Sequence, residues 1–220
     1  MTKRAYGQYC GLARALEMVG ERWALLILRD LFVGPRRFTD LRRGLPRVPT
    51  NVLTTRLKEL ESVGVIRRRV LPRPAGSVVY ELTNYGKELE GAIVSLGRWG
   101  AKSLGEPRAE EIATPDALVM ALRSTFRGEA ARGLRLGYEL RFGEIVVHAQ
   151  IDAGVLEAGE GALPAPDLVI ETGPALKALM AGEVTPAEAI ERGSVRLTGN
   201  PDLLARFVEL FPIAPLPPAA

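Results

Sequence analysis

The sequence predicts an α+β protein built from two domains. In the first half, apolar residues recur at helical spacing in successive segments, and two short valine-containing runs follow with a Pro- and Gly-rich loop between them. In the second half, runs in which apolar and polar residues alternate are interleaved with segments of helical spacing, which favours a sheet with helices on one side. Charge divides in the same way: residues 1–104 hold 19 Lys and Arg against 9 Asp and Glu, and residues 105–220 hold 10 against 17.

Three helices are expected before residue 47. Leu12, Leu16 and Val19 mark the first helix, which stops at Gly20. The second runs from about residue 22 to residue 32 and ends before the Gly-Pro pair at 34–35, and a short third helix breaks at Pro46.

A fourth helix beginning at Thr50 has two unlike faces. Leu53, Leu57 and Leu60 share one stripe at the spacing of a buried helix face. The opposite face is short, hydrogen-bonding and basic, unlike the Glu/Lys pattern of a solvated helix, and it consists of Asn51, Thr55, Lys58 and Ser62, with Thr54 on the flank. We therefore expect this face to read a partner.

Helix, short helix, turn, helix and then a basic hairpin over 65–71 and 77–83 is the order of a winged helix-turn-helix. In that fold the fourth helix meets base edges in the major groove, where Asn pairs with adenine, Lys with guanine and the Thr methyl with thymine. Residues 36–73 carry 11 Arg and Lys against three acids, which suits phosphate contacts. The predicted DNA-binding residues are Arg36, Arg37, Arg42, Arg43, Arg47, Thr50, Asn51, Thr54, Thr55, Arg56, Lys58 and Arg73.

The predicted domains are residues 1–104, for DNA binding and dimerisation, and 114–220, joined by an acidic linker at 105–113. A helix starts at Thr114, strands follow at 134–142, 144–152 and 167–172, and a strand at 194–200 precedes a last helix at 201–211. A helix ending at Gly182 and a capping box at Thr185 fall between the last strands. This pattern predicts an antiparallel sheet covered by helices.

The residues predict no enzyme. His148, the one histidine, has no placed acid or nucleophile beside it, so it is interpreted as structural. One Cys and one His cannot build a metal site, no Gly-rich loop cradles a phosphate, and no cofactor is expected. With a single cysteine, no signal peptide and no apolar run long enough to span a bilayer, we expect a cytoplasmic protein without a membrane partner.

Residues 8–104 resemble the HxlR family of bacterial winged-helix transcription regulators. The matching motifs are Cys10 before the first helix, ALEMVGERWALLILRDL (15–31), GPRRFTDLRRGLP (34–46), LTTRLKELESVGVIRRRV (53–70), VYELTNYGKEL (79–89) and LGRWG (96–100). The resemblance implies a homodimer, held by the first and last helices of this half, on a two-fold symmetric stretch of double-stranded DNA. It also implies a redox-sensing candidate in Cys10, for which an inert thiol is the alternative.

Residues 114–211 look like the sterol-carrier type 2 family, mainly through ALKALMAGEVTPAEAIERGSVRLTGNPDLLARFVELF (175–211). That family implies an apolar cavity between sheet and helices that holds a hydrophobic small molecule. The side chains we expect on its wall are Phe126, Tyr138, Phe142, Met180, Phe207 and Phe211.

The combined prediction is a dimeric, sequence-specific transcriptional regulator on a palindromic operator, modulated by a hydrophobic effector in its second domain. Two alternatives stay open. One is a carrier of hydrophobic molecules whose basic half is a docking module, and the other is an architectural protein that binds DNA without sequence preference.

Overall fold

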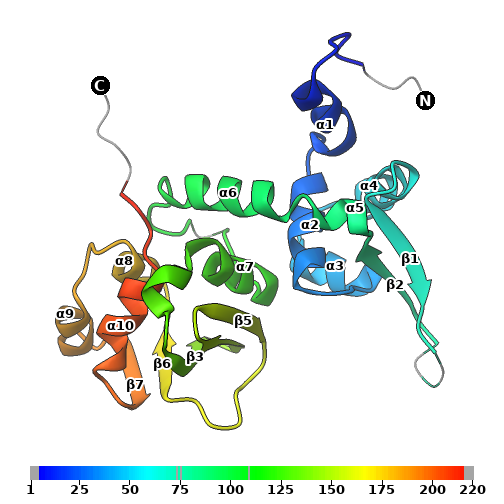
Figure 1. Ribbon diagram of the computed structural model, residues 1–220. Helices are drawn as coiled ribbons and strands as arrows, with labels where there is room; N and C mark the ends of the chain where they lie inside the picture. The colour runs from blue at the N-terminus through cyan, green and yellow to red at the C-terminus, as the bar shows by residue number, and fades with distance from the viewer. Residues whose placement is uncertain (1–4, 73, 75, 109, 216–220) are drawn as a thin grey trace. The chain divides into compact units, whose positions relative to one another are not determined.

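The computed structural model describes residues 5–72, 74, 76–108 and 110–215. The chain divides into two compact units, Met1–Ile93 and Val94–Ala220, each with its own core. Figure 1 shows the first unit from blue to cyan-green, with the helices and the hairpin, and the second from green to red, around a larger sheet. The helix α6 (Glu90–Ala101) includes the boundary between the two units.

The first unit has the predicted order of helices and hairpin. It consists of α1 (Gly11–Val19), α2 (Ala24–Val33), α3 (Phe38–Gly44), α4 (Thr50–Ser62), β1 (Ile66–Val70), β2 (Val78–Leu82) and α5 (Asn84–Lys87). The antiparallel pair β1–β2 forms the wing, and the backbone of Arg36 adds an isolated bridge to Tyr80, with N–H to oxygen distances of 3.0 and 2.8 Å. After the wing, Thr83 caps the short helix α5, with its hydroxyl accepting from the Gly86 N–H at 3.0 Å, and α6 follows.

The leucine stripe of α4 fixes how this helix lies in the first unit. Leu53, Leu57 and Leu60 are each at most 1% exposed, and α4 contacts α1 and β1. Burying three leucines contributes about 1.5–3 kcal/mol for each side chain, so the orientation of α4 about its axis is well defined. At the end of the helix, Gly64 takes a φ of +75°, which glycine adopts without strain, and the chain turns into β1.

The second unit is a five-stranded sheet with helices. After α6 it contains α7 (Pro115–Thr125), the 3-10 turn η1 (Gly128–Ala131), β3 (Arg135–Phe142), β4 (Ile145–Asp152), β5 (Val155–Glu160), β6 (Leu168–Thr172), α8 (Ala175–Met180), α9 (Pro186–Glu191), β7 (Val195–Gly199) and α10 (Leu203–Leu210). The strand order is β5-β4-β3-β6-β7, and α7 and α10 pack against the strands (Figure 1).

The prediction of a purely antiparallel sheet is wrong, because β3 and β6 pair in parallel, Tyr138 opposite Leu168. The reason is the route of residues 161–167. They return along the sheet from the end of β5 to the start of β3, where the Asp167 N–H donates to the carbonyl of Gly137 at 2.8 Å. β6 therefore begins beside the beginning of β3 and runs in the same direction. The other three strand pairs of this sheet are antiparallel, and one of them joins β4 to β5, a strand that was not predicted.

The same returning segment covers the face of the sheet that carries Glu139 and His148. The N–H of Leu163 donates to Oε2 of Glu139 at 3.1 Å, and Nδ1 of His148 lies 3.0 Å from the carbonyl oxygen of Gly161. Since a carbonyl oxygen only accepts, Nδ1 of His148 carries the proton in this bond. His148 ties a loop to the sheet, which agrees with the structural role given to it from the sequence.

Candidate nucleic-acid interface

The outer face of α4 presents polar side chains above the buried leucines. Thr50, Asn51 and Lys58 are exposed, and Ser62 is exposed near the end of the same face. Asn51 stands in the first turn of the helix, the end from which a recognition helix contacts base edges. The helix thus offers an amide and an ammonium group to a partner from a rigid, well-packed support.

The two threonines of this face are held differently. The hydroxyl of Thr54 donates to the carbonyl oxygen of Thr50 at 2.8 Å, and the hydroxyl of Thr55 donates to that of Asn51 at 2.9 Å. Both side chains are half-buried. Because each hydroxyl hydrogen is engaged within the helix, these threonines have methyl groups and acceptor lone pairs left for a base edge.

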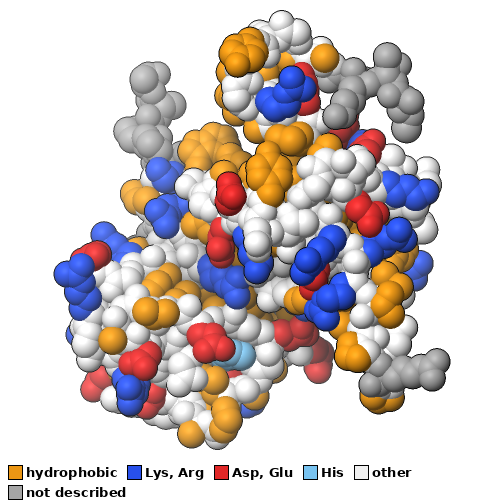
Figure 2. Space-filling model, turned by 45° about the vertical axis from the view of Figure 1, so that its right-hand side comes forward, with side chains coloured by type: hydrophobic (Ala, Val, Ile, Leu, Met, Phe, Trp, Pro, Cys, Tyr) orange, Lys and Arg blue, Asp and Glu red, His pale blue; other side chains and the backbone are white. Residues whose placement is uncertain are grey.

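Exposed cations surround the start of α4. Arg42 and Arg43 project from the last turn of α3, Arg47 lies in the connection before α4, and Arg37 lies at the start of α3. The α3 start is capped by Asp40, whose carboxylate accepts from the Arg37 N–H at 2.9 Å. On the right of the view in Figure 2, several blue patches of Lys and Arg side chains lie at the surface with red carboxylates among them.

Three of the predicted DNA-binding arginines stand apart from this exposed group. Arg56 is 18% exposed and is ion-paired to Glu21 and Glu59. Arg36 is half-buried, and its backbone joins the wing to the segment between α2 and α3. Arg73 lies outside the described residues. The sequence could not separate Arg56 from the exposed arginines, because Glu21, which pairs with it, is distant in the chain.

The wing carries three further arginines that the sequence reasoning did not include among the site residues. Arg67 and Arg69 both bind the carboxylate of Glu81, at 2.8 and 2.7 Å, and Arg68 lies 3.1 Å from Glu61. The hydrogen bond from Arg69 is the main reason that the pKa of Glu81 is lowered. The run RRR at 67–69 was a visible signal, but its charge is partly neutralised within the protein.

The turn between α1 and α2 is strained. Trp23 has a φ of +79°, a left-handed conformation that is unusual for a bulky residue and costs about 1–3 kcal/mol. The guanidinium of Arg22 lies 5.3 Å from the centre of the Trp23 ring, and the Trp23 carbonyl accepts from Ile27 at 2.9 Å. Contacts around this turn must offset the strain, and Arg56 supplies one of them by donating to the carbonyl oxygen of Arg22 at 3.3 Å.

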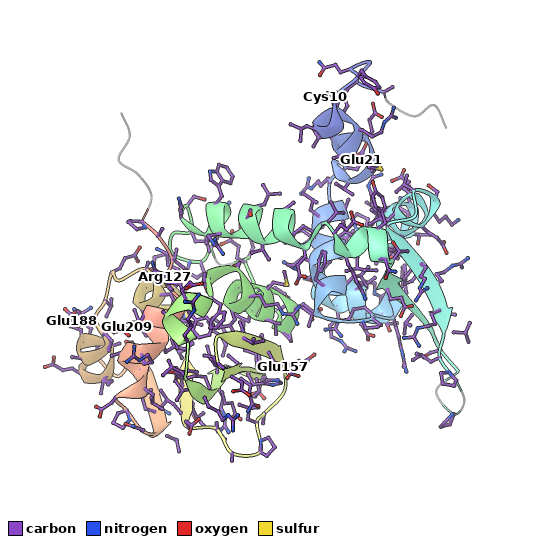
Figure 3. All side chains as sticks on the ribbon, viewed as in Figure 1. Cys10, Glu21, Arg127, Glu157, Glu188 and Glu209 are labelled. Atoms are coloured by element: carbon purple, nitrogen blue, oxygen red, sulfur yellow. The ribbon has the colours of Figure 1, made fainter. Side chains whose placement is uncertain are left out.

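Cys10 is exposed and lies at the N-terminus of α1 (Figure 3). The pKa of its thiol is lowered from the ordinary value, first by the backbone N–H of Ala13 and then by that of Leu12, because both groups favour the thiolate. Arg14, four residues further along the chain, forms an ion pair with Glu17 at 2.7 Å. The backbone of α1, rather than an arginine, is therefore what lowers the pKa of this thiol.

Four of the six predicted ligand-contacting side chains form one aromatic cluster in the second unit. The ring centres of Phe207 and Phe211 are 4.8 Å apart, Phe126 lies 5.5 Å from Phe211, and Tyr138 lies 5.4 Å from Phe207. Tyr138 is fully buried, donates its hydroxyl to the Leu203 carbonyl at 3.2 Å and has its pKa raised to about 12 by burial. The structure does not bring the other two into this ring cluster: Met180 is buried in α8, and Phe142 is half-buried at the end of β3.

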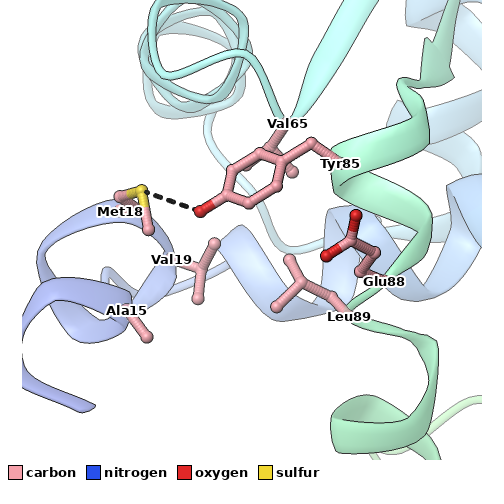
Figure 4. Close-up of a pocket in the computed structure, with 7 residues that line it drawn as sticks. All are labelled: Ala15, Met18, Val19, Val65, Tyr85, Glu88 and Leu89. Atoms are coloured by element: carbon pink, nitrogen blue, oxygen red, sulfur yellow. Dashed lines mark hydrogen bonds between the residues drawn. The ribbon is translucent and has the colours of Figure 1, made fainter. Parts of the chain in front are cut away.

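A cavity of about 220 Å³ lies in the first unit, lined by Ala15, Met18, Val19, Val65, Tyr85, Glu88 and Leu89. Figure 4 shows Tyr85 directed toward α1, with its hydroxyl 3.8 Å from the sulfur of Met18. A second cavity, of about 500 Å³, lies in the second unit between residues 102–107, α8 and residues 213–215. Neither is lined by the six predicted ligand-contacting residues.

Among the described residues, no group of three or more His, Cys, Asp or Glu side chains forms a metal-binding cluster. No helix in the described part of the chain is long and apolar enough to cross a membrane.

Comparisons with known proteins agree with this geometry. Residues 18–108 match the family described as HxlR-like helix-turn-helix. The chain is 42% identical over 112 residues to the uncharacterized HTH-type transcriptional regulator Rv3095 of Mycobacterium tuberculosis, covering 51% of this chain and 69% of that protein. It is 38% identical over 104 residues to YtcD of Bacillus subtilis, another uncharacterized HTH-type transcriptional regulator, and the match covers 47% of this chain and 81% of that protein. Among solved structures, the reduced form of the regulator YodB from B. subtilis is 30% identical over 46% of this chain and all of that chain, with a TM-score of 0.39.

The helices, the wing and these relatives define a DNA-binding transcriptional regulator of the helix-turn-helix class. Within that class, the chain belongs to the HxlR-like helix-turn-helix family.

Proposed function

We propose that the protein reads a specific DNA sequence with the outer face of α4. The observation that carries this proposal is the exposed pair Asn51 and Lys58 on a helix whose opposite stripe is fully buried. Asn binds the N6 and N7 edge of adenine through two hydrogen bonds, and Lys donates to guanine. Exposed arginines of α3 and of the connection before α4 supply phosphate contacts, which position the helix without reading sequence.

The test is a comparison of Asn51→Ala and Ser62→Ala on operator and on random DNA. Both residues lie on the polar face of α4, but Ser62 is at its far end and donates its hydroxyl to the Glu59 carbonyl at 2.8 Å. Asn51→Ala should cost about 1–3 kcal/mol on the operator and little on random DNA. Ser62→Ala should leave both affinities near those of the wild type. Equal losses on both DNAs for Asn51→Ala would contradict base reading by α4.

Footprinting on genomic fragments recovered with the protein separates the three candidate functions. A discrete footprint with two-fold symmetry supports the sequence-specific regulator. Uniform protection along the DNA supports an architectural protein, and an absence of protection supports a carrier with a basic docking module. Because the partner is DNA, we place the protein in the cytoplasm of a bacterial cell.

We further propose that the functional form is a homodimer held by α1 and α6. Large apolar side chains are exposed on each helix: Leu12 is 70% exposed and Leu16 41% exposed on α1, and Leu96 is 51% and Trp99 73% exposed on α6. Exposed apolar groups of this size on adjacent turns favour burial against a partner. Sedimentation should show a dimer that Leu16→Glu weakens, while Leu26→Glu, which alters an equally exposed leucine of α2, should not.

For the second unit, we propose a sterol-carrier-like module that binds an apolar effector. The supporting observation is the element order from α8 to α10, with glycines at 182, 193 and 199 in positive-φ turns, and the packing of α7 and α10 against the sheet. The aromatic cluster under α10 sets a condition on this proposal. Because Phe207 and Phe211 are in ring contact, an effector between helix and sheet has to separate the rings.

Binding and its consequence for DNA can be measured together. Fatty acids, polyketides and other flat apolar compounds are screened by thermal shift, and solvent extracts of the purified protein are searched for co-purifying apolar molecules. A compound that raises the melting temperature should also change operator affinity, with a coupling of about 1–3 kcal/mol in either direction. If nothing co-purifies and no compound shifts the melting temperature, the second unit is a folded core without an effector.

A further inference from the structure

We propose that Arg56 is a positioning residue that locks the recognition helix α4 to the turn between α1 and α2, and is not a phosphate contact. The inference rests on the proposed role of α4. In addition to the buried leucine stripe, which sets the face that α4 buries, it assigns to α4 an ion-pair clamp whose partners are 34 and 35 residues away in the chain.

The clamp consists of three bonds from one guanidinium. One terminal nitrogen of Arg56 lies 2.9 Å from Oε2 of Glu21, the other binds the carboxylate of Glu59, and Nε donates to the Arg22 carbonyl oxygen at 3.3 Å. Glu59 belongs to α4 itself, whereas Glu21 and Arg22 belong to the turn after α1 (Figure 3 labels Glu21 there). A planar fork with several fixed donors can hold this geometry, and an ammonium group cannot.

Burial argues against a phosphate contact. The Arg56 side chain is 18% exposed, and it lies between two carboxylates that already neutralise its charge. To reach a phosphate, the Arg56 side chain would have to break its bonds to Glu21, to Glu59 and to the Arg22 carbonyl at the same time. By contrast, the side chains of Arg42, Arg43 and Arg47, which are predicted to bind phosphates, are exposed to solvent and can reach a phosphate.

The anchor point is itself a defined piece of structure. The turn holds Trp23 at a φ of +79°, with the Arg22 guanidinium stacked at 5.3 Å from its ring, so the position of the Arg22 carbonyl is fixed. Arg56 thereby connects α4 to the end of α1, the helix that we propose for dimer contact. The clamp therefore holds α4 in a fixed direction relative to α1. Because α1 is proposed to contact the second protomer, the clamp also affects the distance between the two recognition helices of a dimer.

The two roles predict opposite effects of Glu21→Gln on DNA affinity. If Arg56 contacted phosphate, removing the carboxylate would release the arginine and reduce local negative charge, and the affinity for all DNA would rise. If Arg56 is a clamp, α4 loses a support, and operator affinity should fall by about three- to tenfold while random-DNA affinity changes little. Glu21 is 48% exposed on its side chain, so this substitution leaves the core intact.

Three arginine variants complete the experiment, each measured by anisotropy over a series of salt concentrations. Arg56→Ala and Arg56→Lys should both lose about tenfold or more on the operator, with the slope of log affinity against log salt unchanged. Arg47→Ala, the matched exposed control, should instead reduce that slope, because each lost phosphate contact changes it by about 0.9. Retained affinity in Arg56→Lys, or a reduced slope in Arg56→Ala, would overturn the clamp.

Failure of this inference can be told apart from failure of the proposed function. If wild-type protein shows no sequence preference, the recognition role of α4 fails and the clamp has nothing to position. If the wild type is specific and Glu21→Gln binds more tightly, only the clamp fails. Should Arg56→Ala not fold by circular dichroism, the sign of the Glu21→Gln effect still decides the question.

Discussion

Substituting Arg47 gives the sharpest quantitative test of how this regulator holds DNA. Four exposed arginines of one protomer are proposed as phosphate contacts: Arg37, Arg42, Arg43 and Arg47. A dimer would present eight. If all eight neutralise phosphates, log affinity should fall against log salt with a slope of about −7, which is a loss of about 10⁴-fold between 50 and 200 mM salt.

Arg47→Ala removes two of these cations from the dimer. The slope should then become about −5, and the loss over the same salt range about 10³-fold, on operator and random DNA alike. The assay is fluorescence anisotropy of labelled duplexes at five or more salt concentrations. Arg127→Ala is the control, because it removes an exposed arginine from the second unit and the same net charge. A slope that Arg47→Ala leaves unchanged, or that both variants change equally, would refute the placement of phosphates around α4.

Three further predictions concern the thiol and the packing of the first unit. Because backbone N–H groups lower the pKa of Cys10, its alkylation should begin at lower pH in the folded protein than in a peptide of residues 5–15. Identical pH profiles for the protein and the peptide would contradict the lowered pKa. If that thiolate senses oxidants, diamide should change operator affinity in the wild type and leave Cys10→Ser unaffected, and equal responses would make the thiol inert. Gly86→Ala should lower the melting temperature through a loss of about 1–3 kcal/mol, because its Cβ would stand 2.0 Å from the Val65 carbonyl oxygen. Gly91→Ala, which meets no atom within 4 Å in α6, should be neutral or stabilising by up to about 1 kcal/mol, and a similar fall in both variants would contradict the close approach.

The elements of the first unit could be predicted because their signals are local. The leucine stripe at 53, 57 and 60 and the breaker residues at 34–35 each act within a few residues, and α4 starts at Thr50 as predicted. In the second unit, the capping box at Thr185 is present as predicted, with the Glu188 N–H donating to the Thr185 hydroxyl at 3.2 Å.

The strand β5 was missed because its sequence, VLEAGE, has little apolar alternation. It is an edge strand with exposed Val155, and it forms because its backbone pairs with β4 from Val147 to Asp152. A strand that is stabilised mainly by backbone hydrogen bonds to a neighbouring strand needs little alternation of apolar and polar side chains, so its sequence carries only a weak strand signal. The parallel pairing of β6 was hidden for a related reason, since the path of residues 161–167 depends on contacts with Gly137 and Glu139 in a distant strand.

The sequence by itself determined which face of α4 is buried, where the basic residues concentrate and to which family the first half is similar. These properties follow from side-chain periodicity and composition, which are local. Only the tertiary structure decided which of those basic residues are exposed. The sequence alone does not distinguish Arg56 from Arg47. In the structure, Arg56 forms an ion pair with Glu21, 35 residues away in the chain, and is largely buried, whereas Arg47 is exposed. Ion pairs and burial depend on distance in space rather than on distance along the chain, so only the tertiary structure separates the two arginines.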